Sequence, residues 1–414
     1  MVAADAVTNC RSCGSDRLKQ IVDLGLTPIA NALVDAENAP ESDAVYPLNV
    51  VFCEACALVQ LGAALPAGAM FDTDYPYFSS FSPAFVEHAR AYAAAMTDRL
   101  ALSSEDLVVE IASNDGYLLK NFVANGVRAL GVDPSPGPAR AAEEIGVPTI
   151  VDFFGRNVAA KIVESYGPAR LVAANNVMAH VPDLDDFVGG FAILLADDGL
   201  LTVENPYVRD LVDHVEFDTI YHEHYCYYSC SSVDALMQRH GLHLNDVEYF
   251  PDLHGGTLRW FIGKHPARTA RCDEYLAREE RDGLRTFAFY QGLSTAVSAC
   301  QESLRTMLTA LRAEGRRVVA YGAAAKGATL LNSTGIGTDL LDYVVDRNPH
   351  KQGKLMPGCR LPIRPVEVLL DDRPDDVVLL SWNFAEEIAR QQQAYVEQGG
   401  RFIVPVPTAH VLGS

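Results

Sequence analysis

The chain has 414 residues, of which 49% are hydrophobic and 21% are charged, a composition that is typical of a globular protein and excludes a disordered chain. Its formal net charge of −21 repels nucleic acids and anionic membranes, so neither is expected as a partner. No apolar run reaches the roughly 18–20 residues of a membrane span and no secretory signal is apparent, so we expect a cytoplasmic protein of two or three domains.

Four of the nine cysteines are grouped as two CxxC pairs, Cys10-x2-Cys13 and Cys53-x2-Cys56. Each pair can place two sulfurs on one metal ion, so the spacing predicts a four-thiolate zinc site, which is structural because no coordination position stays open. A disulfide is less favoured because the cysteine total is odd, and a redox CxxC because neither pair lies in a βαβ pattern. The other five are expected to be small apolar residues: Cys226, Cys230, Cys272, Cys300 and Cys359.

Residues 1–68 form the expected zinc-binding domain, which contains short β-like runs such as residues 46–52. The aromatic stretch that follows, MFDTDYPYFSSF, shows no clear helical or strand pattern. Ser82 and Pro83 then supply an N-cap and a first helical residue, which predict a helix that ends near Leu100.

From Leu107 onward, short β-branched runs alternate with helical segments. The runs LVVEIA, ALGVDPS, TIVDFF, RLVAANNV and GLLTVEN are predicted strands. Strands separated by helices imply a parallel sheet with right-handed crossovers. We therefore predict a doubly wound, Rossmann-like α/β domain over residues 69–267.

Residues 268–414 are predicted to hold a helical connector and a second α/β domain. The connector, residues 268–314, reads mainly as helix. The segment RRVVAYGAAAKGATLL then has a strand–turn–helix pattern, and LDYVVDRN, DVVLLSW and RFIVPVP are predicted strands. This C-terminal domain is therefore also Rossmann-like, and the two α/β units are candidates for distant structural relatives of each other.

The first strand of the central domain ends in an acidic turn, Glu110-Ile-Ala-Ser-Asn-Asp-Gly116. The turn is neither the GxGxxG fingerprint of dinucleotide-binding folds nor a P-loop, and its carboxylates would face a pyrophosphate. In a doubly wound sheet the ligand lies beyond the carboxyl ends of the strands. An acidic turn suits a cationic ligand, and S-adenosylmethionine carries a sulfonium and an ammonium group.

Three further strand ends are polar. Asp133 stands where a carboxylate would bind the ribose hydroxyls, Asp152 and Phe153 would bracket the adenine, and Asn175 faces the same crevice. Taken singly, Asp133 is explained better by a turn and Asn175 by a satisfied loop amide; the run of four polar strand ends reverses this and favours a site. The candidate cofactor-binding residues are Glu110, Ala112, Asn114, Asp115, Gly116, Asp133, Asp152, Phe153 and Asn175.

The segment Asp218-Thr-Ile-Tyr-His-Glu-His-Tyr225 holds the densest group of proton-transfer side chains. It follows the strand end at residues 204–207, so we expect it to lie over the same crevice, together with His180 and His254. Imidazoles are suited to general-base catalysis at neutral pH.

Two other interpretations of this segment stay open. His222 and His224 could form a same-face pair on a strand, either exposed or as metal ligands, although no third ligand has a suitable spacing. Alternatively, YHEHYCYY could be an aromatic core or interface strand, in which the imidazoles would be costly to bury unless they are paired.

The motifs CxxC…CxxC, DYPYFSSFS, EIASNDGYLL, NNVMAHVPD, TIYHEHYCYYS, HGGTLR and YGAAAKG occur in this order over nearly the whole chain. In this the sequence resembles the S-adenosylmethionine-dependent C-methyltransferases of TDP-deoxysugar biosynthesis, which methylate C-3′ of a 4-keto sugar nucleotide. The resemblance implies a zinc domain, a class I methyltransferase domain and a C-terminal Rossmann-like domain that binds substrate. It also implies a TDP-linked 4-keto deoxysugar as substrate and a role in antibiotic biosynthesis.

The resemblance further implies residue roles. His224 would be the base that removes the C-3′ proton, Tyr221 and Glu223 would support or orient that transfer, and His180 would lie near the 4-keto oxygen. Asn175, a cofactor candidate, would also line the sugar pocket. The candidate substrate-binding residues are Tyr75, Tyr77, Ser79, Asn176, Asn205, His254, Tyr321 and Lys326.

The chemistry is consistent in itself. A proton next to a ketone can be removed once donors stabilise the enolate oxygen, and the enolate carbon can then attack the sulfonium methyl in line. No metal is needed for either step, which agrees with a zinc ion that is structural.

An acidic protein needs a basic pocket for a sugar-nucleotide diphosphate. Residues 347–364 contain five lysines and arginines and no acid, although a solvated loop explains them equally well. Lys326 is the better candidate because it opens a helix after a strand, and helix N-termini favour anions.

Three other functions are compatible with parts of the sequence but are less favoured. An O- or N-methyltransferase needs less acid–base machinery than the segment 218–225 offers. A zinc-ribbon adaptor without catalysis would bind no nucleoside. A nucleotide-sugar oxidoreductase is disfavoured because YGAAAKG lacks the dinucleotide glycine spacing. The sequence says little about assembly, for which a monomer or weak homodimer is expected.

Overall fold

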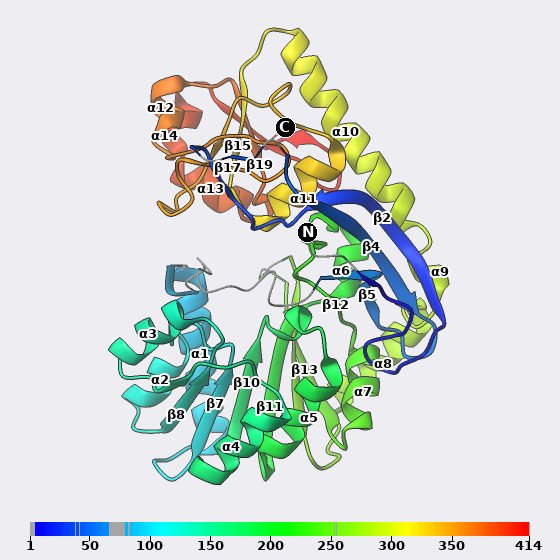
Figure 1. Cartoon of the computed structure of the whole chain (residues 1–414), viewed down its shortest axis with the longest axis vertical. Coiled ribbons are helices and arrows are strands. Elements are labelled where there is room, and N and C mark those ends of the chain that lie inside the picture. Colours follow the sequence, from blue (N-terminus) through cyan, green and yellow to red (C-terminus); the bar gives the residue numbers. More distant parts are fainter. Residues whose placement is uncertain are drawn as a thin grey trace.

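Two α/β sheets and a smaller N-terminal sheet build the molecule (Figure 1). The central sheet lies in one lobe and the C-terminal sheet in the other, while the long strands β2 and β4 run along one side beside helix α10. The computed structural model describes residues 5–37, 39–40, 42–65, 79–81, 83–251, 253 and 255–413.

The central sheet has seven strands in the order β13-β14-β11-β10-β7-β8-β9. The five strands from β11 to β9 are parallel, as predicted for strands separated by helices. The edge hairpin adds two strands that the sequence did not reveal: β14 runs antiparallel to β11, and β13, which pairs antiparallel with β14, runs in the same direction as the five parallel strands. The strands are β7 (Leu107–Ile111), β8 (Arg128–Val132), β9 (Thr149–Ile150), β10 (Ala169–Asn175), β11 (Leu195–Pro206), β13 (His243–Phe250) and β14 (Thr257–Gly263).

Helices cover both faces of this sheet. Val108 of β7 packs with the helices α1 and α2, whereas its neighbour Val109 packs in the core that contains α4, α5 and α7. Successive side chains of a strand point to opposite faces, so this division is the doubly wound arrangement that the sequence predicts. The helices are α1 (Pro83–Leu100), α2 (Leu119–Ala124), α3 (Pro136–Glu144), α4 (Arg156–Tyr166), α5 (Leu184–Leu194), α6 (Val208–Asp213) and α7 (Cys230–Arg239).

The C-terminal sheet has the order β18-β16-β15-β19-β20-β21 and is parallel except for its edge strand β21. The predicted connector is helical: α8 (Ala270–Asp282), α9 (Phe287–Tyr290) and α10 (Leu293–Ala313). The strands are β15 (Val318–Tyr321), β16 (Val344–Val345), β18 (Ile363–Arg364), β19 (Asp376–Leu379), β20 (Arg401–Val404) and β21 (His410–Val411). The helices between them are α11 (Ala325–Thr334), α12 (Val368–Asp372), α13 (Ala385–Gln391) and α14 (Gln393–Glu397).

The N-terminal segment is tied to both lobes. Its four-stranded sheet has the order β12-β5-β4-β2, and the edge strand β12 comes from the central domain. A two-residue strand, β3 (Val34–Asp35), pairs with β17 (Lys354–Leu355) of the C-terminal domain. The strands of the N-terminal sheet are β2 (Leu18–Pro28), β4 (Val45–Cys53), β5 (Val59–Leu61) and β12 (Cys226–Tyr227), and β1 (Asp5–Ala6) pairs with β6 (Ala63–Ala64).

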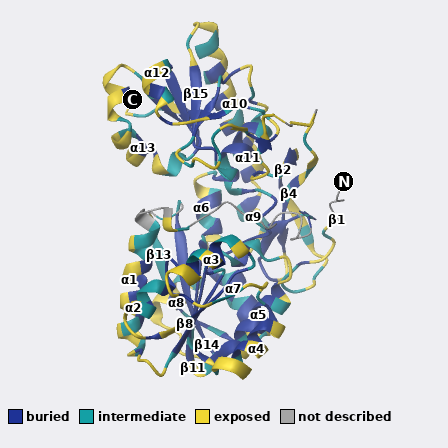
Figure 2. Cartoon of the chain, turned by 60° about the vertical axis from the view of Figure 1, so that its left-hand side comes forward, coloured by how far each residue is buried: buried dark blue, intermediate teal, exposed yellow. Residues whose placement is uncertain are grey.

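Burial follows this architecture. Figure 2 shows the strands of both α/β sheets buried and the outward faces of the helices exposed. One hydrophobic core contains Phe52 of the N-terminal sheet, Phe217 of the central domain and Leu304 of α10, so the three parts share an interior. Within the described residues, no helix is both long enough and apolar enough to cross a bilayer.

Candidate active site

The four cysteines of the two CxxC pairs meet in the N-terminal segment. Their Sγ atoms all lie within 4.8 Å of one another, and the Cys10–Cys56 and Cys13–Cys53 separations are both 3.6 Å. A tetrahedral zinc ion with Zn–S bonds of about 2.3 Å places its sulfurs about 3.8 Å apart. The four thiols therefore fit a zinc ion whose ligands are all supplied by protein, as in structural sites.

The turn after β7 is the predicted cofactor loop. Ala112 and Asn114 have φ angles of 57° and 49°, a left-handed conformation that residues with a Cβ adopt at a cost. Gly116 has φ 75°, and a Cβ there would lie 3.2 Å from the side chains of Ala142 and Val147. The loop between β7 and α2 is therefore a strained turn, and its conformation depends on these residues.

Asp133 fixes this loop from the end of β8. Its carboxylate accepts the backbone N–H of Asn114 at 2.9 Å and that of Ser135 at 2.8 Å. Two neutral donors leave further lone pairs on the carboxylate, so it can still accept hydroxyl groups of a ligand. Burial raises the pKa of Asp133, and the neighbouring Asp115 carboxylate raises it further.

Buried oxygen atoms without a protein partner gather at this end of the sheet. Within the described part of the chain, Glu110 Oε2, Asp115 Oδ1, Asn175 Oδ1 and Asn205 Oδ1 accept no hydrogen bond. Burial, together with the carboxylates of Asp133, Asp115 and Glu204, raises the pKa of Glu110 well above its ordinary value. Buried acceptors of this kind need donors, and the ammonium and ribose hydroxyl groups of S-adenosylmethionine are donors that fit them.

The adenine candidates lie on the surface. Asp152 and Phe153 follow β9 in an exposed loop, and the Phe153 ring is 54% exposed although it is apolar. Asp152 accepts the backbone N–H of Phe153 at 2.8 Å. An exposed ring at the third strand end agrees with stacking on a base, which stays a prediction.

Ser79 contacts the cofactor loop. In the short turn Ser79–Phe81, the backbone N–H of Ser79 donates to Asn114 Oδ1 at 2.9 Å, and that of Ser80 donates to Asp115 Oδ2 at 3.1 Å. The segment before α1 therefore closes over the loop. Tyr75, Tyr77 and His254 lie outside the described residues.

The predicted catalytic residues occupy a tight turn. The backbone N–H of His224 donates to the carbonyl of Tyr221 at 2.9 Å, so residues 221–224 are a turn, not a strand with His222 and His224 on one face. His222 is turned toward β4, where its ring lies 6.0 Å from that of Tyr46. The turn presents Tyr221, Glu223 and His224 on its other sides.

His224 is held by two hydrogen bonds. Its Nδ1 lies 2.8 Å from the Thr219 carbonyl oxygen, and its Nε2 lies 2.6 Å from the Tyr221 hydroxyl. A carbonyl oxygen can only accept, so Nδ1 carries the hydrogen and Nε2 keeps the lone pair that Tyr221 donates to. Nε2 is therefore the atom of His224 that can take a proton.

His180 and Glu223 complete the group. The His180 ring centroid is 4.7 Å from that of His224, and burial lowers the pKa of His180 to about 4, so it is neutral at pH 7. Burial raises the pKa of Glu223 to about 7. Asn31 Nδ2 opposes that rise by donating to both Glu223 oxygens at 2.9 and 2.8 Å. Sequence patterns gave no signal for Asn31, which follows β2 in the N-terminal segment.

A second group that the sequence did not reveal lies beside the cofactor loop. Arg259 Nε donates to Glu204 Oε1 at 2.6 Å, and His88 of α1 lies 3.0 Å from Glu204 Oε2. The guanidinium group also lies over the rings of Tyr92 and Phe250, at 4.7 and 4.6 Å. Burial opposes ionisation of Glu204, but His88 and Arg259 lower its pKa overall. The negative charge of Glu204 is therefore balanced by Arg259 within the protein.

The C-terminal candidates occupy two places. Tyr321 is buried at the carboxyl end of β15, and its hydroxyl bonds to no described residue. Lys326 points instead toward the catalytic segment, where its Nζ lies 3.9 Å from Asp218 Oδ1 and 4.3 Å above the Trp382 ring. The basic stretch 347–364 is partly used in ion pairs: Lys351–Asp346, Arg360–Asp43 and Arg364–Asp372.

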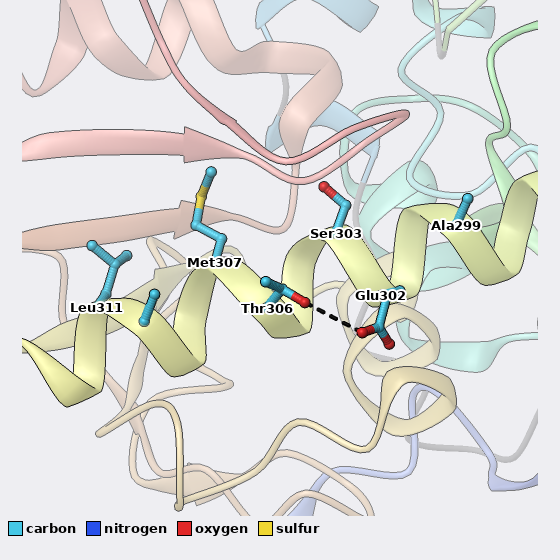
Figure 3. Close-up of a pocket in the computed structure, with 7 residues that line it drawn as sticks. Ala299, Glu302, Ser303, Thr306, Met307 and Leu311 are labelled. Carbon is cyan, nitrogen blue, oxygen red and sulfur yellow. Dashed lines mark hydrogen bonds between the residues drawn. The ribbon is translucent and has the colours of Figure 1, made fainter.

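The cavities on the described surface include the following two. One, of about 410 Å³, is lined by residues of both lobes, among them Glu216, Gly255 and Trp382, and lies next to the Lys326–Asp218 pair. The other, of about 630 Å³, lies along the outer face of α10, where Thr306 bonds to Glu302 beside Ser303 and Met307 (Figure 3). The second cavity contains none of the predicted site residues.

Three family models and one relative match the chain. The models match as a zinc binding domain over residues 10–71, a methyltransferase domain over 85–247 and a C-methyltransferase C-terminal domain over 252–407. C-methyltransferase NovU of Streptomyces niveus is 36% identical over 412 residues, which are 99% of this chain and 97% of NovU.

Solved structures are more distant. A methyltransferase of Clostridium acetobutylicum and the magnesium protoporphyrin IX methyltransferase of Synechocystis are 11% and 12% identical, with TM-scores of 0.35 and 0.32. The matches cover 43% and 44% of this chain and 91% and 78% of those chains, and at such scores they do not establish a function. The relation to NovU extends over nearly all of both chains and agrees with the crevice and the four thiols. The chain therefore belongs to the S-adenosylmethionine-dependent C-methyltransferases, with a zinc-binding domain at its N-terminus.

Proposed function

We propose that the protein transfers a methyl group from S-adenosylmethionine to C-3′ of a TDP-linked 4-keto deoxysugar, in the biosynthesis of a secondary metabolite. The observation that most supports this proposal is which ring nitrogen of His224 carries the hydrogen. The Thr219 carbonyl fixes Nδ1–H, so the lone pair of His224 lies on Nε2, where the Tyr221 hydroxyl donates to it. A base oriented in this way is what the activation of a carbon acid needs.

The residues around His224 fit the remaining steps. In the protein without substrate, the Tyr221 hydroxyl donates to Nε2 at 2.6 Å; in the proposed complex, the C-3′ hydrogen takes its place. His180 is neutral at pH 7, so it can donate a hydrogen bond to the 4-keto oxygen as negative charge develops there. Glu223 and Asn31 hold the turn from the N-terminal side.

The acidic crevice would hold the cofactor, which supplies an electrophilic methyl group on its sulfonium sulfur. Glu110, Asp115 and Asp133 supply the negative charge, and the carbonyl oxygens of Asn175 and Asn205 are further free acceptors within the described residues. Asn176, next to the strand end, has φ 53° and turns the chain toward the same edge. On the other side, Tyr321 and Lys326 are the candidates for the nucleotide part of the substrate.

Proton removal can be measured separately from methyl transfer. The enzyme, saturated with S-adenosylhomocysteine, is mixed in D₂O with a TDP-4-keto deoxysugar, and exchange at C-3′ is followed by NMR. We expect exchange without methylation, and a C-3′ methyl product once S-adenosylmethionine is supplied. Methylation of oxygen or nitrogen without exchange would instead indicate a heteroatom methyltransferase, and the absence of nucleoside binding would indicate an adaptor.

A further inference from the structure

The segment that precedes the catalytic turn is packed against the C-terminal domain. The short helix η4 (Phe217–Thr219) lies on helix α11. Phe217 and Ile220 are buried in the same core as Leu331 of α11. The segment is therefore shaped by residues that lie more than 100 positions away in the sequence.

Polar contacts from the C-terminal domain reach the two residues that flank Thr219. Trp382 Nε1 donates to Asp218 Oδ2 at 2.6 Å, and Thr329 Oγ1 donates to the buried carbonyl of Ile220 at 3.0 Å. Asp218 is fully buried, and Lys326 Nζ balances its charge from 3.9 Å. Buried groups of this kind are costly to leave without partners, so these contacts define the path of the backbone.

Thr219 lies between these two anchored residues, and its carbonyl accepts Nδ1–H of His224 at 2.8 Å. We infer that Thr329 and Trp382 are positioning residues for His224: they hold Asp218 and Ile220 so that the Thr219 carbonyl fixes the imidazole with its lone pair on Nε2. This inference rests on the proposed role of His224 as the base. It gives the C-terminal domain a part in proton removal that is separate from substrate binding.

The test uses the full-length enzyme with the substitutions Thr329→Val and Trp382→Phe, singly and together. Thr329→Val keeps the shape of the side chain, Trp382→Phe keeps an aromatic ring but is smaller, and each removes one donor. We expect kcat and the rate of C-3′ exchange to fall about 10- to 100-fold, since small displacements of a reacting group have effects of that size. KM for the sugar nucleotide and the affinity for S-adenosylhomocysteine stay as in the wild type.

The matched control is Thr334→Val. Thr334 ends the same helix, and its buried hydroxyl makes no hydrogen bond to a described residue. This variant removes a hydroxyl from α11 without touching the catalytic segment, so its kcat should equal that of the wild type.

The spectroscopic readout is the ¹⁵N NMR signal of histidine, with His224 assigned by its loss in His224→Asn. We expect one protonated Nδ1 and one bare Nε2 in the wild type and in Thr334→Val, and a mixture of tautomers in the double variant. An unchanged kcat overturns the inference, and so does a fall in kcat with an unchanged ¹⁵N pattern, which would be a general structural effect.

The two proposals fail in different ways. If His224→Asn keeps full C-3′ exchange, His224 is not the base and the proposed mechanism is wrong. The ¹⁵N pattern of Thr329→Val and Trp382→Phe still decides whether these side chains set the state of the imidazole.

Discussion

The central and C-terminal sheets repeat one arrangement with opposite electrostatic results. In the first, Asp133 follows β8 and accepts the backbone N–H groups of Asn114 and Ser135. In the second, Asp346 follows β16 and accepts those of Ala323 and Asn348, at 2.7 and 2.8 Å. In both, a carboxylate after one strand ties down the turn that follows the neighbouring strand.

The difference lies in what surrounds each carboxylate. Lys351 Nζ lies 4.0 Å from Asp346 and donates to the Ala323 carbonyl at 2.8 Å. The crevice beside Asp346, called the second crevice below, therefore contains a cation of its own. Around Asp133 the charged neighbours are Asp115 and Glu110, and buried acceptors there have no described partner. The same backbone arrangement therefore leaves acceptors open for a cation from outside in one sheet and is satisfied internally in the other.

The largest effect is expected from His224→Asn, which tests whether the reaction takes place beside the crevice that Glu110, Asp115 and Asp133 line (the first crevice). Asparagine cannot take the C-3′ proton, so kcat should fall about 10²- to 10⁴-fold, the usual contribution of a general base. S-adenosylhomocysteine affinity, measured by calorimetry, should not change because the crevice is untouched. Equal turnover in the variant would remove His224 from the mechanism.

The next effect compares the two carboxylates directly. Asp133→Asn should weaken S-adenosylhomocysteine binding about 10- to 100-fold, because hydrogen bonds to a charged acceptor contribute about 1.5–3 kcal/mol. Asp346→Asn is the matched control, with the same substitution at the same place in the other sheet, and should leave that affinity unchanged. If both variants lose affinity equally, the cause is a loss of folding and the comparison fails.

A smaller effect concerns pH. The pKa of Glu110 is raised well above its ordinary value, mainly by burial, so the carboxyl is protonated below that raised pKa and charged above it. A cation binds the charged form better, so affinity for S-adenosylmethionine should rise with pH, by about three- to tenfold, relative to that for S-adenosylhomocysteine, which lacks the sulfonium charge. Glu110→Gln should flatten this ratio. A ratio that stays pH-dependent in Glu110→Gln would place the titrating group elsewhere.

Much of the fold could be predicted from sequence because its signals are local. Alternating strands and helices identified both α/β units, and the CxxC spacing identified the zinc ligands. The β13–β14 hairpin is a local element that the sequence pattern did not indicate. The pairing of β3 with β17 has no local signal, because its partners Val34 and Leu355 lie 321 positions apart. No short-range pattern indicates such a contact.

The residues of the candidate site likewise divide into those that a local sequence signal predicts and those that none predicts. Residues at strand ends, such as Glu110 and Asp133, follow from the topology of a doubly wound sheet. Asn31 and Trp382 do not, because each reaches the catalytic segment from another domain, across 192 and 164 positions. Lys326, which we expect to face a diphosphate, lies 3.9 Å from the fully buried carboxylate of Asp218, a contact that the sequence pattern did not indicate. Its role in phosphate binding stays a prediction.

The smallest effect is expected from Lys351→Met, which makes the second crevice resemble the first. The change removes a cation whose side chain is 21% exposed, and the lost bond to the Ala323 carbonyl should cost about 1 kcal/mol of unfolding free energy in a urea titration. Lys264→Met is the control, since its pair with the exposed Asp197 at 3.4 Å should contribute less. S-adenosylhomocysteine should still bind once per chain, because among the described residues no group of unpartnered carboxylate and amide oxygens like that of the first crevice is buried beside Asp346. A second bound equivalent would show that a single lysine, and not the set of free acceptors, separates the two sheets.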